Sequence, residues 1–276
     1  MEESRVARLN HQTDSVMGLI RRPQPDYSRE LKTALVFAAL VAVLGALLAA
    51  SVHWSLVDPG SVTGLIMAFS LGMVVTCALS SSLAFLIVLR HKLLLITGGS
   101  LALVVASILL GWAPLEGLAK ILFATSAGLW ISLMLTSIGQ VLLIAGLIIL
   151  VDFYSVFLGP TRKIVESGSN WIDYLTINLP VFGAPASSQI GISDIIFFSL
   201  FVGVSINYLL RRTSTALALT ASFIATMVFG VKLEIGVPAL PLLSVFFLLA
   251  NADLLYHRFL SEPDEHKRED GNKRSA

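Results

Sequence analysis

The sequence predicts an all-α membrane protein that crosses the lipid bilayer several times. Hydrophobic residues make up 55% of its 276 residues and charged residues only 13%, and its mean hydropathy is +0.82. Soluble globular domains carry about twice that share of charge. A helix needs roughly 20 apolar residues to cross a hydrocarbon core about 30 Å thick, and runs of that length recur along this chain.

The apolar runs form two groups of predicted spans. A polar tail over 1 to 33 precedes an N-terminal group within 34 to 136, and a second group occupies 137 to 256. The first run is too long for the core of a signal peptide, so we expect it to remain as a span. The total is eight, or nine if an N-terminal span escapes the criterion. The predicted spans lie near 34 to 56, 62 to 89, 93 to 111, 117 to 136, 138 to 158, 191 to 210, 214 to 231 and 237 to 256.

Two segments outside the spans differ from the short links elsewhere. The connection over 159 to 190 is the one long link between spans. The last residues, 257 to 276, are charged and have the composition of a disordered tail.

Composition and residue counts argue against several functions. The net charge of +1 gives no basis for nucleic acid binding, and the single cysteine, Cys77, excludes an intrachain disulfide framework. The five histidines are scattered, and no metal-ligand cluster or Gly-rich phosphate loop is present. We therefore expect neither a metal nor another cofactor.

The distribution of Lys and Arg predicts the orientation in the membrane. With the N-terminus in the cytoplasm, 15 of the 19 Lys and Arg residues fall on the cytoplasmic side, and only Lys120, Arg162, Lys163 and Lys232 do not. This is the bias that the positive-inside rule describes. Both termini are therefore predicted to be cytoplasmic in a multi-pass protein of the cell membrane, and the connection over 159 to 190 is predicted to face the opposite side.

Two carboxylates, Asp152 and Asp194, lie inside the apolar runs. An ionised acid there costs about 2.5 kcal/mol or more, so such residues usually have a function. Asp152 lies about six residues before the end of its predicted span and Asp194 about four after the start of the next. At 1.5 Å per residue, both lie roughly 6 to 9 Å below the same membrane face.

Paired carboxylates at matching depth indicate chemistry that needs a shared proton. Two acids brought close together cannot both ionise at low cost, so the pair holds one proton between them. One carboxylate can then activate a water while the other polarises a peptide carbonyl. The alternatives from the residues alone are helix-end acids that reach the interface, or a proton or cation relay in a transporter or channel.

The neighbours of the two acids favour the catalytic interpretation. Gly191 and Ser193 precede Asp194, and such small residues allow a substrate backbone to approach the acid. The last predicted span opens with Pro238, Ala239, Leu240 and Pro241. We expect these prolines to limit regular helix there and to leave backbone groups beside a cavity.

These motifs resemble the presenilin and signal peptide peptidase family of intramembrane aspartyl proteases, most closely its presenilin-like prokaryotic members. The family pairs Tyr-Asp in one helix with Gly-x-Gly-Asp in the next and carries Pro-Ala-Leu at the start of a later helix. The chain reads Val151-Asp152, then Gly191-Ile192-Ser193-Asp194, then Pro238-Ala239-Leu240. The resemblance covers about residues 138 to 256, and the first four spans match in hydropathy only.

The chain departs from the family pattern in three ways. Val151 stands in place of the motif tyrosine, with Tyr154 close by, and Ser193 stands in place of the glycine before the second Asp. Eight spans are counted where the family usually has nine. The connection between the two aspartate helices is cytoplasmic in presenilins and lies on the other face in signal peptide peptidases, and the charge count favours the second arrangement.

The resemblance implies hydrolysis of peptide bonds within transmembrane segments, without a cofactor. Asp152 and Asp194 would be catalytic. The segment Pro238 to Leu240, with Gly191 and Ser193, would bind substrate. The implied partners are transmembrane substrates and the bilayer, and the oligomeric state is not predicted. A catalytically inactive relative that only binds membrane helices is the remaining alternative.

The connection between the two acids contains a candidate β-strand. Residues 171 to 179 alternate with a period of two, as a half-buried strand does. A strand there would hold an unwound substrate by β-augmentation, between the connection and Pro238 to Leu240. The alternative is that 171 to 179 lies in the membrane interface. Five other polar residues in the spans are expected to be interhelical hydrogen bonders, or span-end residues that reach the membrane interface, rather than catalytic groups: Lys120, Gln140, Asn207, Asn251 and Asp253.

Overall fold

The structure is a computed structural model that describes most of the chain after residue 61. The described residues are 62 to 111, 113 to 157, 174 to 179, 188 to 233 and 237 to 274, with a few isolated positions before 62. The chain divides into two units, Met1–Val36 and Phe37–Ala276, and the elements below belong to the second. The predicted span over 34 to 56 lies outside the described residues apart from those isolated positions.

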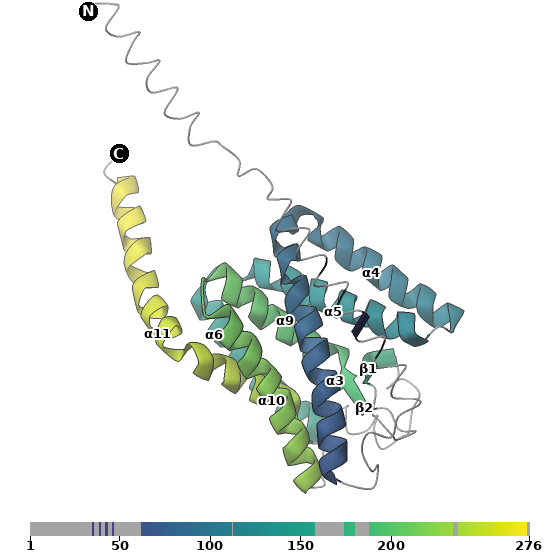
Figure 1. Ribbon diagram of the computed structural model, residues 1–276. Coiled ribbons are helices and arrows are strands. Elements are labelled where there is room, and N and C mark those ends of the chain that lie inside the picture. The colour runs from purple at the N-terminus through teal and green to yellow at the C-terminus, as the bar shows by residue number, and fades with distance from the viewer. Residues whose placement is uncertain are drawn as a thin grey trace, which may run out of the picture. The chain divides into compact units, whose positions relative to one another are not determined.

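Six helices in the described part are long and apolar enough to cross a membrane. Each coincides with one of the predicted spans to within a few residues, so the described part of the chain is mostly helical and has six candidate membrane spans. They are α3 (Val62–Ser82, continued by the 3₁₀ helix η1, Leu83–Leu89), α4 (Arg90–Leu110), α5 (Ala113–Met134), α6 (Ile138–Phe157), α10 (Arg212–Leu233) and α11 (Ala239–Arg274) (Figure 1).

Helix α9 (Ile192–Asn207) is shorter than the span predicted over 191 to 210. Its 16 residues rise about 24 Å, less than the hydrocarbon core. The chain enters α9 directly from a β-strand and leaves it at a sharp turn. There Leu209 has φ 49°, and the N–H of Leu210 donates to the carbonyl of Ser205 at 2.7 Å. This bond, with the left-handed residue before it, is the Schellman pattern that ends helices, so α9 ends abruptly.

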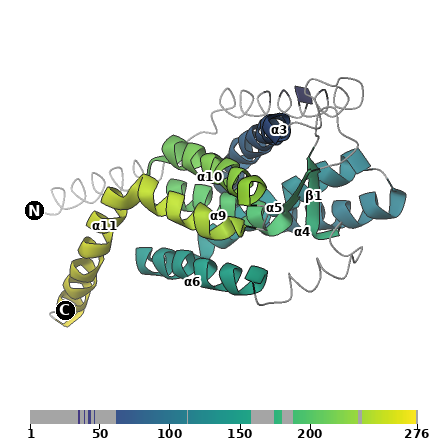
Figure 2. The same ribbon diagram turned by 90° about the horizontal axis from the view of Figure 1, so that it is seen from below.

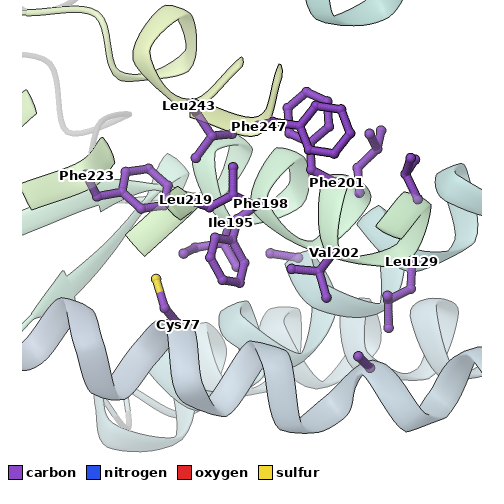
Figure 3. Close-up of a cluster of buried hydrophobic side chains, with 14 of the residues drawn as sticks. Cys77, Leu129, Ile195, Phe198, Phe201, Val202, Leu219, Phe223, Leu243 and Phe247 are labelled. Atoms are coloured by element: carbon purple, nitrogen blue, oxygen red, sulfur yellow. The ribbon is translucent and has the colours of Figure 1, made fainter. Parts of the chain in front are cut away.

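Helix α9 forms the centre of the bundle and packs against α3, α5, α10 and α11 (Figures 1 and 2). Its side chains are apolar on nearly every face, which is typical of a helix buried all round. Phe201 stacks on Phe247 of α11 with ring centroids 4.3 Å apart, and Phe198 lies 6.2 Å from Phe223 of α10. Figure 3 shows this cluster, with Cys77 of α3 beside it.

Two glycines allow α5 and α9 to pack with their backbones close together. A Cβ added at Gly128 of α5 would collide with the backbone oxygen of Ile196 and lie 2.8 Å from the Cβ of Ser199. A Cβ added at Gly203 of α9 would collide with the side chain of Ser132. Small residues have this function in membrane interfaces, where close backbone approach replaces the hydrophobic driving force.

A two-stranded antiparallel sheet precedes α9 in the otherwise helical fold, and only its first strand lies within the predicted one. Strand β1 (Thr176–Leu179) pairs with β2 (Ser188–Gly191), with Thr176 opposite Gly191 and Ile177 opposite Ile190. Ile177 and Ile190 are buried, whereas Asn178 is exposed. The strand predicted over 171 to 179 is thus confirmed for 176 to 179 only, because Tyr174 and Leu175 are helical and 171 to 173 lie outside the described residues.

Polar contacts join several helices at the end of α9 opposite the sheet. Arg211, between α9 and α10, forms an ion pair of 2.6 Å with Asp253 of α11. Arg212 donates to the carbonyl of Ser81 at 3.1 Å. Asn251 donates to the hydroxyl of Thr215 at 2.8 Å. These bonds tie α3, α10 and α11 together at this end.

Helix α11 continues to Arg274 through the charged segment for which composition predicts disorder. The segment is rich in Glu, Lys and Arg, which have high helix propensity. The preceding membrane helix supplies the nucleus that an isolated helix lacks.

The close approach of α5 and α9 predicts that Gly128 is the less replaceable of two membrane glycines. Gly128→Ala should destabilise the protein by about 1–3 kcal/mol, because the added methyl group must push the α9 backbone away. Gly146→Ala is the matched control, since nothing lies within 4 Å of a Cβ added there. Thermal unfolding in detergent measures both, and equal midpoints for the two variants would contradict the packing argument.

Candidate active site

Asp152 lies near the end of α6 and accepts a hydrogen bond from the start of α11. The backbone N–H of Leu240 donates to Asp152 Oδ2 at 3.1 Å. Leu240 is the second residue of α11, so its N–H is one of the first four that have no partner within the helix. The half-buried carboxylate therefore lies at the positive end of the α11 dipole.

Asp194 has the same relation to α9. It is the third residue of that helix, and its Oδ2 accepts a hydrogen bond of 3.2 Å from the backbone N–H of Gly191, the N-cap residue. A carboxylate at this position that reaches back to the N-cap forms half of a capping box. Asp194 is also half-buried.

Asp152 and Asp194 lie at the same end of the bundle, near the end of α6 and at the start of α9. In the described part of the chain, neither carboxylate forms an ion pair with a Lys or Arg. The favourable electrostatic partners of the two acids are thus the N-termini of α11 and α9. The pairing of the two acids as a reacting dyad stays a prediction.

Gly191 leaves space beside the carboxylate of Asp194. An added Cβ would lie 3.0 Å from Asp194 Oδ2 and 3.2 Å from the hydroxyl of Ser193. The backbone of Gly191 is extended, with φ −64° and ψ 140°, which any residue adopts. Glycine is therefore needed at this position because a larger residue would crowd the Asp194 carboxylate, and not because of its backbone angles. Ser193 is exposed beside it.

Pro238, Ala239 and Leu240 meet the site at the start of α11. Pro238 and Leu240 are buried and Ala239 is half-buried. The helix begins at Ala239 and includes Pro241. Pro241 is tolerated because the first-turn N–H groups have no helical acceptor. The predicted limit on helix thus holds only before Ala239, and the N–H of Leu240 is directed to Asp152.

A buried ion pair that was not assigned to the site lies next to the sheet. Lys120 of α5 is 2% exposed, and its Nζ lies 2.6 Å from Glu116 Oε1. The same Nζ donates to the carbonyl of Thr176 in β1 at 2.8 Å. The bond from Lys120 to Thr176 joins a helix to a strand. Strand β2 was not predicted either, because its four residues, Ser188–Gly191, show no alternation long enough to detect.

The other polar residues predicted to bond between helices divide into two groups. Asn207 donates to the carbonyl of Ser132 at 3.1 Å, and Asn251 and Asp253 make the bonds described above, so these predictions are confirmed. Gln140 instead accepts a local bond of 2.8 Å from the N–H of Thr136.

An apolar pocket lies away from the acids. It has a volume of about 250 Å³ and lies between α6 and α11. Leu142, one of its lining residues, is about 15 Å along α6 from Asp152. Among the described residues, no group of three or more His, Cys, Asp or Glu side chains is placed to hold a metal ion.

Comparison of the chain with models of known protein families finds no match, and comparison with curated protein sequences finds none.

The geometry predicts that the two acids do not stabilise the fold by their charge. Asp152→Asn should leave the unfolding midpoint in detergent unchanged or raise it, because Asn keeps an acceptor for the Leu240 N–H. Removing a membrane charge gains about 2.5 kcal/mol, whereas losing the dipole attraction costs about 1 kcal/mol. Asp152→Leu removes the acceptor and should lower stability by about 1–3 kcal/mol. A lower midpoint for the Asn variant than for the Leu variant would contradict this balance.

Proposed function

We propose that the protein is an intramembrane aspartyl protease of the presenilin and signal peptide peptidase type, which hydrolyses peptide bonds within transmembrane segments. The observation that carries the proposal is that Asp152 and Asp194, at the same end of the bundle, each accept a hydrogen bond from a backbone N–H at the N-terminus of a helix. The order of motifs in the sequence supports it independently.

Two such carboxyl groups supply what peptide hydrolysis needs. One, ionised, accepts a proton from a water as its oxygen attacks the peptide carbonyl carbon. The other, protonated, donates to the carbonyl oxygen, so that a neutral tetrahedral intermediate forms. When this intermediate collapses, the C–N bond breaks, the first carboxyl gives the water proton to the leaving nitrogen, and the second carboxylate takes back the hydroxyl proton. Both acids are half-buried, which leaves each a partly exposed surface for water and substrate.

The sheet supports a mode of substrate binding. The substrate must unwind before the peptide bond is accessible, and the unwound strand needs hydrogen-bond partners in a medium with little water. Strand β2 leads directly into α9 and Asp194, whereas the outer side of β1 at Thr176 faces Lys120 of α5. We therefore place the substrate as a strand along β2, with Pro238 to Leu240 on its other side.

The departures from the family pattern fall at exposed positions. Val151 is 62% exposed, and Ser193 is also exposed. Neither side chain makes the contacts that hold the two carboxylates, which come from the Leu240 and Gly191 backbones. The residues at these two positions are therefore compatible with the proposed chemistry. We expect them to affect which substrates reach the acids.

The proposed location is the cell membrane, with both termini cytoplasmic and the acids near the opposite face. The arrangement of basic residues supports this orientation. Arg211 and Arg212 bond at the end of the bundle away from the sheet, and Asp152, Asp194 and β2 lie at the other end.

The first activity prediction concerns the acids. Asp152→Asn and Asp194→Asn should each reduce cleavage of a transmembrane peptide by about a hundredfold or more, because the mechanism needs both carboxyl groups. Wild-type cleavage should also decline at alkaline pH, where the shared proton is lost. Product analysis by mass spectrometry in detergent or liposomes measures both effects.

A flux assay separates the proposal from a proton or cation relay. Asp253→Asn is a control for the loss of a carboxylate at the other end of the bundle and should cleave normally. Asp152- and Asp194-dependent ion flux in liposomes, without cleavage, would replace the protease by a transporter. Cleavage that survives either active-site variant would exclude the paired-acid mechanism.

The strand model predicts sensitivity to lost backbone N–H groups. Ile177→Pro should weaken substrate binding, because β1 then loses a ladder bond to β2. Leu240→Pro should reduce cleavage more than Leu240→Ala, because only proline removes the donor to Asp152. Cleavage kinetics on folded, purified variants measure these differences. Full activity of Ile177→Pro would show that the sheet does not bind substrate. Equal activity of the two Leu240 variants would show that the bond from the Leu240 N–H to Asp152 is not needed for cleavage.

The orientation is tested with single cysteines in a Cys77→Ala background. Asn178→Cys, in the exposed part of β1, should react with an impermeant thiol reagent only from the non-cytoplasmic side. His257→Cys, near the other end of the candidate span Ala239–Phe259, should react only from the cytoplasm. The reverse pattern would invert the proposed topology.

A further inference from the structure

Lys120 is a buried cation that the proposed reaction does not use. Its side chain is 2% exposed, and its charge is compensated by Glu116, one turn earlier on α5, at 2.6 Å. Glu116 is 26% exposed, so the pair reaches from the protein interior toward the surface. A buried charge in a membrane protein is costly and usually has a function. This pair lies at the end of the bundle that holds the acids.

The second partner of Lys120 is the substrate-binding sheet. Its Nζ donates to the carbonyl of Thr176 at 2.8 Å, and Thr176 is paired with Gly191 across the two strands. The N–H of Gly191 in turn donates to Asp194 at 3.2 Å. One cross-strand pair is therefore held from both sides, by Lys120 of α5 and by Asp194 of α9.

The hydrogen-bond pattern of the sheet explains how both bonds are possible. In an antiparallel ladder, pairs that bond to each other alternate with pairs whose N–H and C=O groups point away from the partner strand. The Thr176 carbonyl accepts from Lys120 and the Gly191 N–H donates to Asp194, as the outward groups of the second type of pair can do. The outward groups are the ones through which Lys120 and Asp194 reach the sheet.

We propose that Lys120, held by Glu116, is a positioning residue that fixes the Asp194 carboxylate through Thr176 and Gly191. This inference rests on the proposed proteolytic function. Movement of the Thr176–Gly191 pair would move the donor on Asp194, and a displacement of about 1 Å at a reacting group lowers a rate by roughly a hundredfold. The same movement would shift β2, and with it the substrate bond that faces the acids.

The test uses the intact protein in detergent with four variants. Lys120→Met removes the charge and the donor at similar length, Glu116→Gln removes the counter-ion, and Lys120→Arg keeps charge and donors. Lys232→Met is the control, because Lys232 is an exposed lysine at the end of α10. Hydrogen exchange of the peptide spanning 174 to 191 reports on the sheet. Cleavage gives kcat, KM and the positions of the cut bonds.

The proposal expects hydrogen exchange in the sheet to rise about tenfold in Lys120→Met and Glu116→Gln, as for the loss of a charged hydrogen bond. Exchange in α3 and α4 should stay as in the wild type. The kcat should fall at least about tenfold and the cut should move to neighbouring bonds. Lys120→Arg should restore both, and Lys232→Met should match the wild type.

Unchanged exchange and an unchanged cleavage position in Lys120→Met would overturn the proposal. A uniform loss of protection would show a folding defect in that variant, and Glu116→Gln then decides by the same two readouts. Lower activity with an unmoved cut in both variants would mark the pair as merely structural and would also overturn the proposal. Absence of cleavage by the wild type would refute the protease, and the exchange comparison would still decide whether Lys120 orders the sheet.

Discussion

The hydrogen bond from the Leu240 N–H to Asp152 is the contact on which the arrangement of the site depends. It joins the end of α6 to the start of α11, two helices that are far apart in the sequence. An unpaired helix N–H and an uncompensated carboxylate are each unfavourable in a membrane, and this bond removes both penalties together. Asp194 repeats the solution at the start of α9 with Gly191. The two carboxylates thus need no buried Lys or Arg beside them. Such a cation would keep both acids ionised, whereas the proposed reaction needs one of them protonated.

The sequence was sufficient to predict the six long apolar helices of the described part and to single out Asp152 and Asp194, because both follow from local composition. A run such as 138 to 158 is long and apolar whatever it packs against, and Asp152 is conspicuous within it. The partners of Asp152 could not be predicted in the same way. The bond to Leu240 depends on how α6 and α11 pack, and no periodicity in either helix encodes that contact.

The sheet could also be predicted only in part from the sequence. The alternation around Ile177 predicted a strand, but strand β2, only four residues long, gave no detectable signal. Its pairing fixes the positions of Thr176 and Gly191, and through them the relation of Lys120 to Asp194. Lys120 alone reads as an ordinary polar residue in a span. Its significance comes from a hydrogen bond to a residue 56 positions later, which only the fold brings near.

The two acids lie on helices that are packed differently. Gly128 and Gly203 allow close contact between the backbones of α5 and α9, and α9 is the helix that carries Asp194. Helix α6 lies on the outside of the bundle beside α11 (Figure 2), with large exposed apolar side chains such as Leu143, Leu147 and Leu150 facing the surroundings. The distance between the two carboxylates is therefore a property of the α6–α11 interface. In a membrane these side chains face the lipid, so we expect the composition of the bilayer to affect the helix that carries Asp152 more than the helix that carries Asp194.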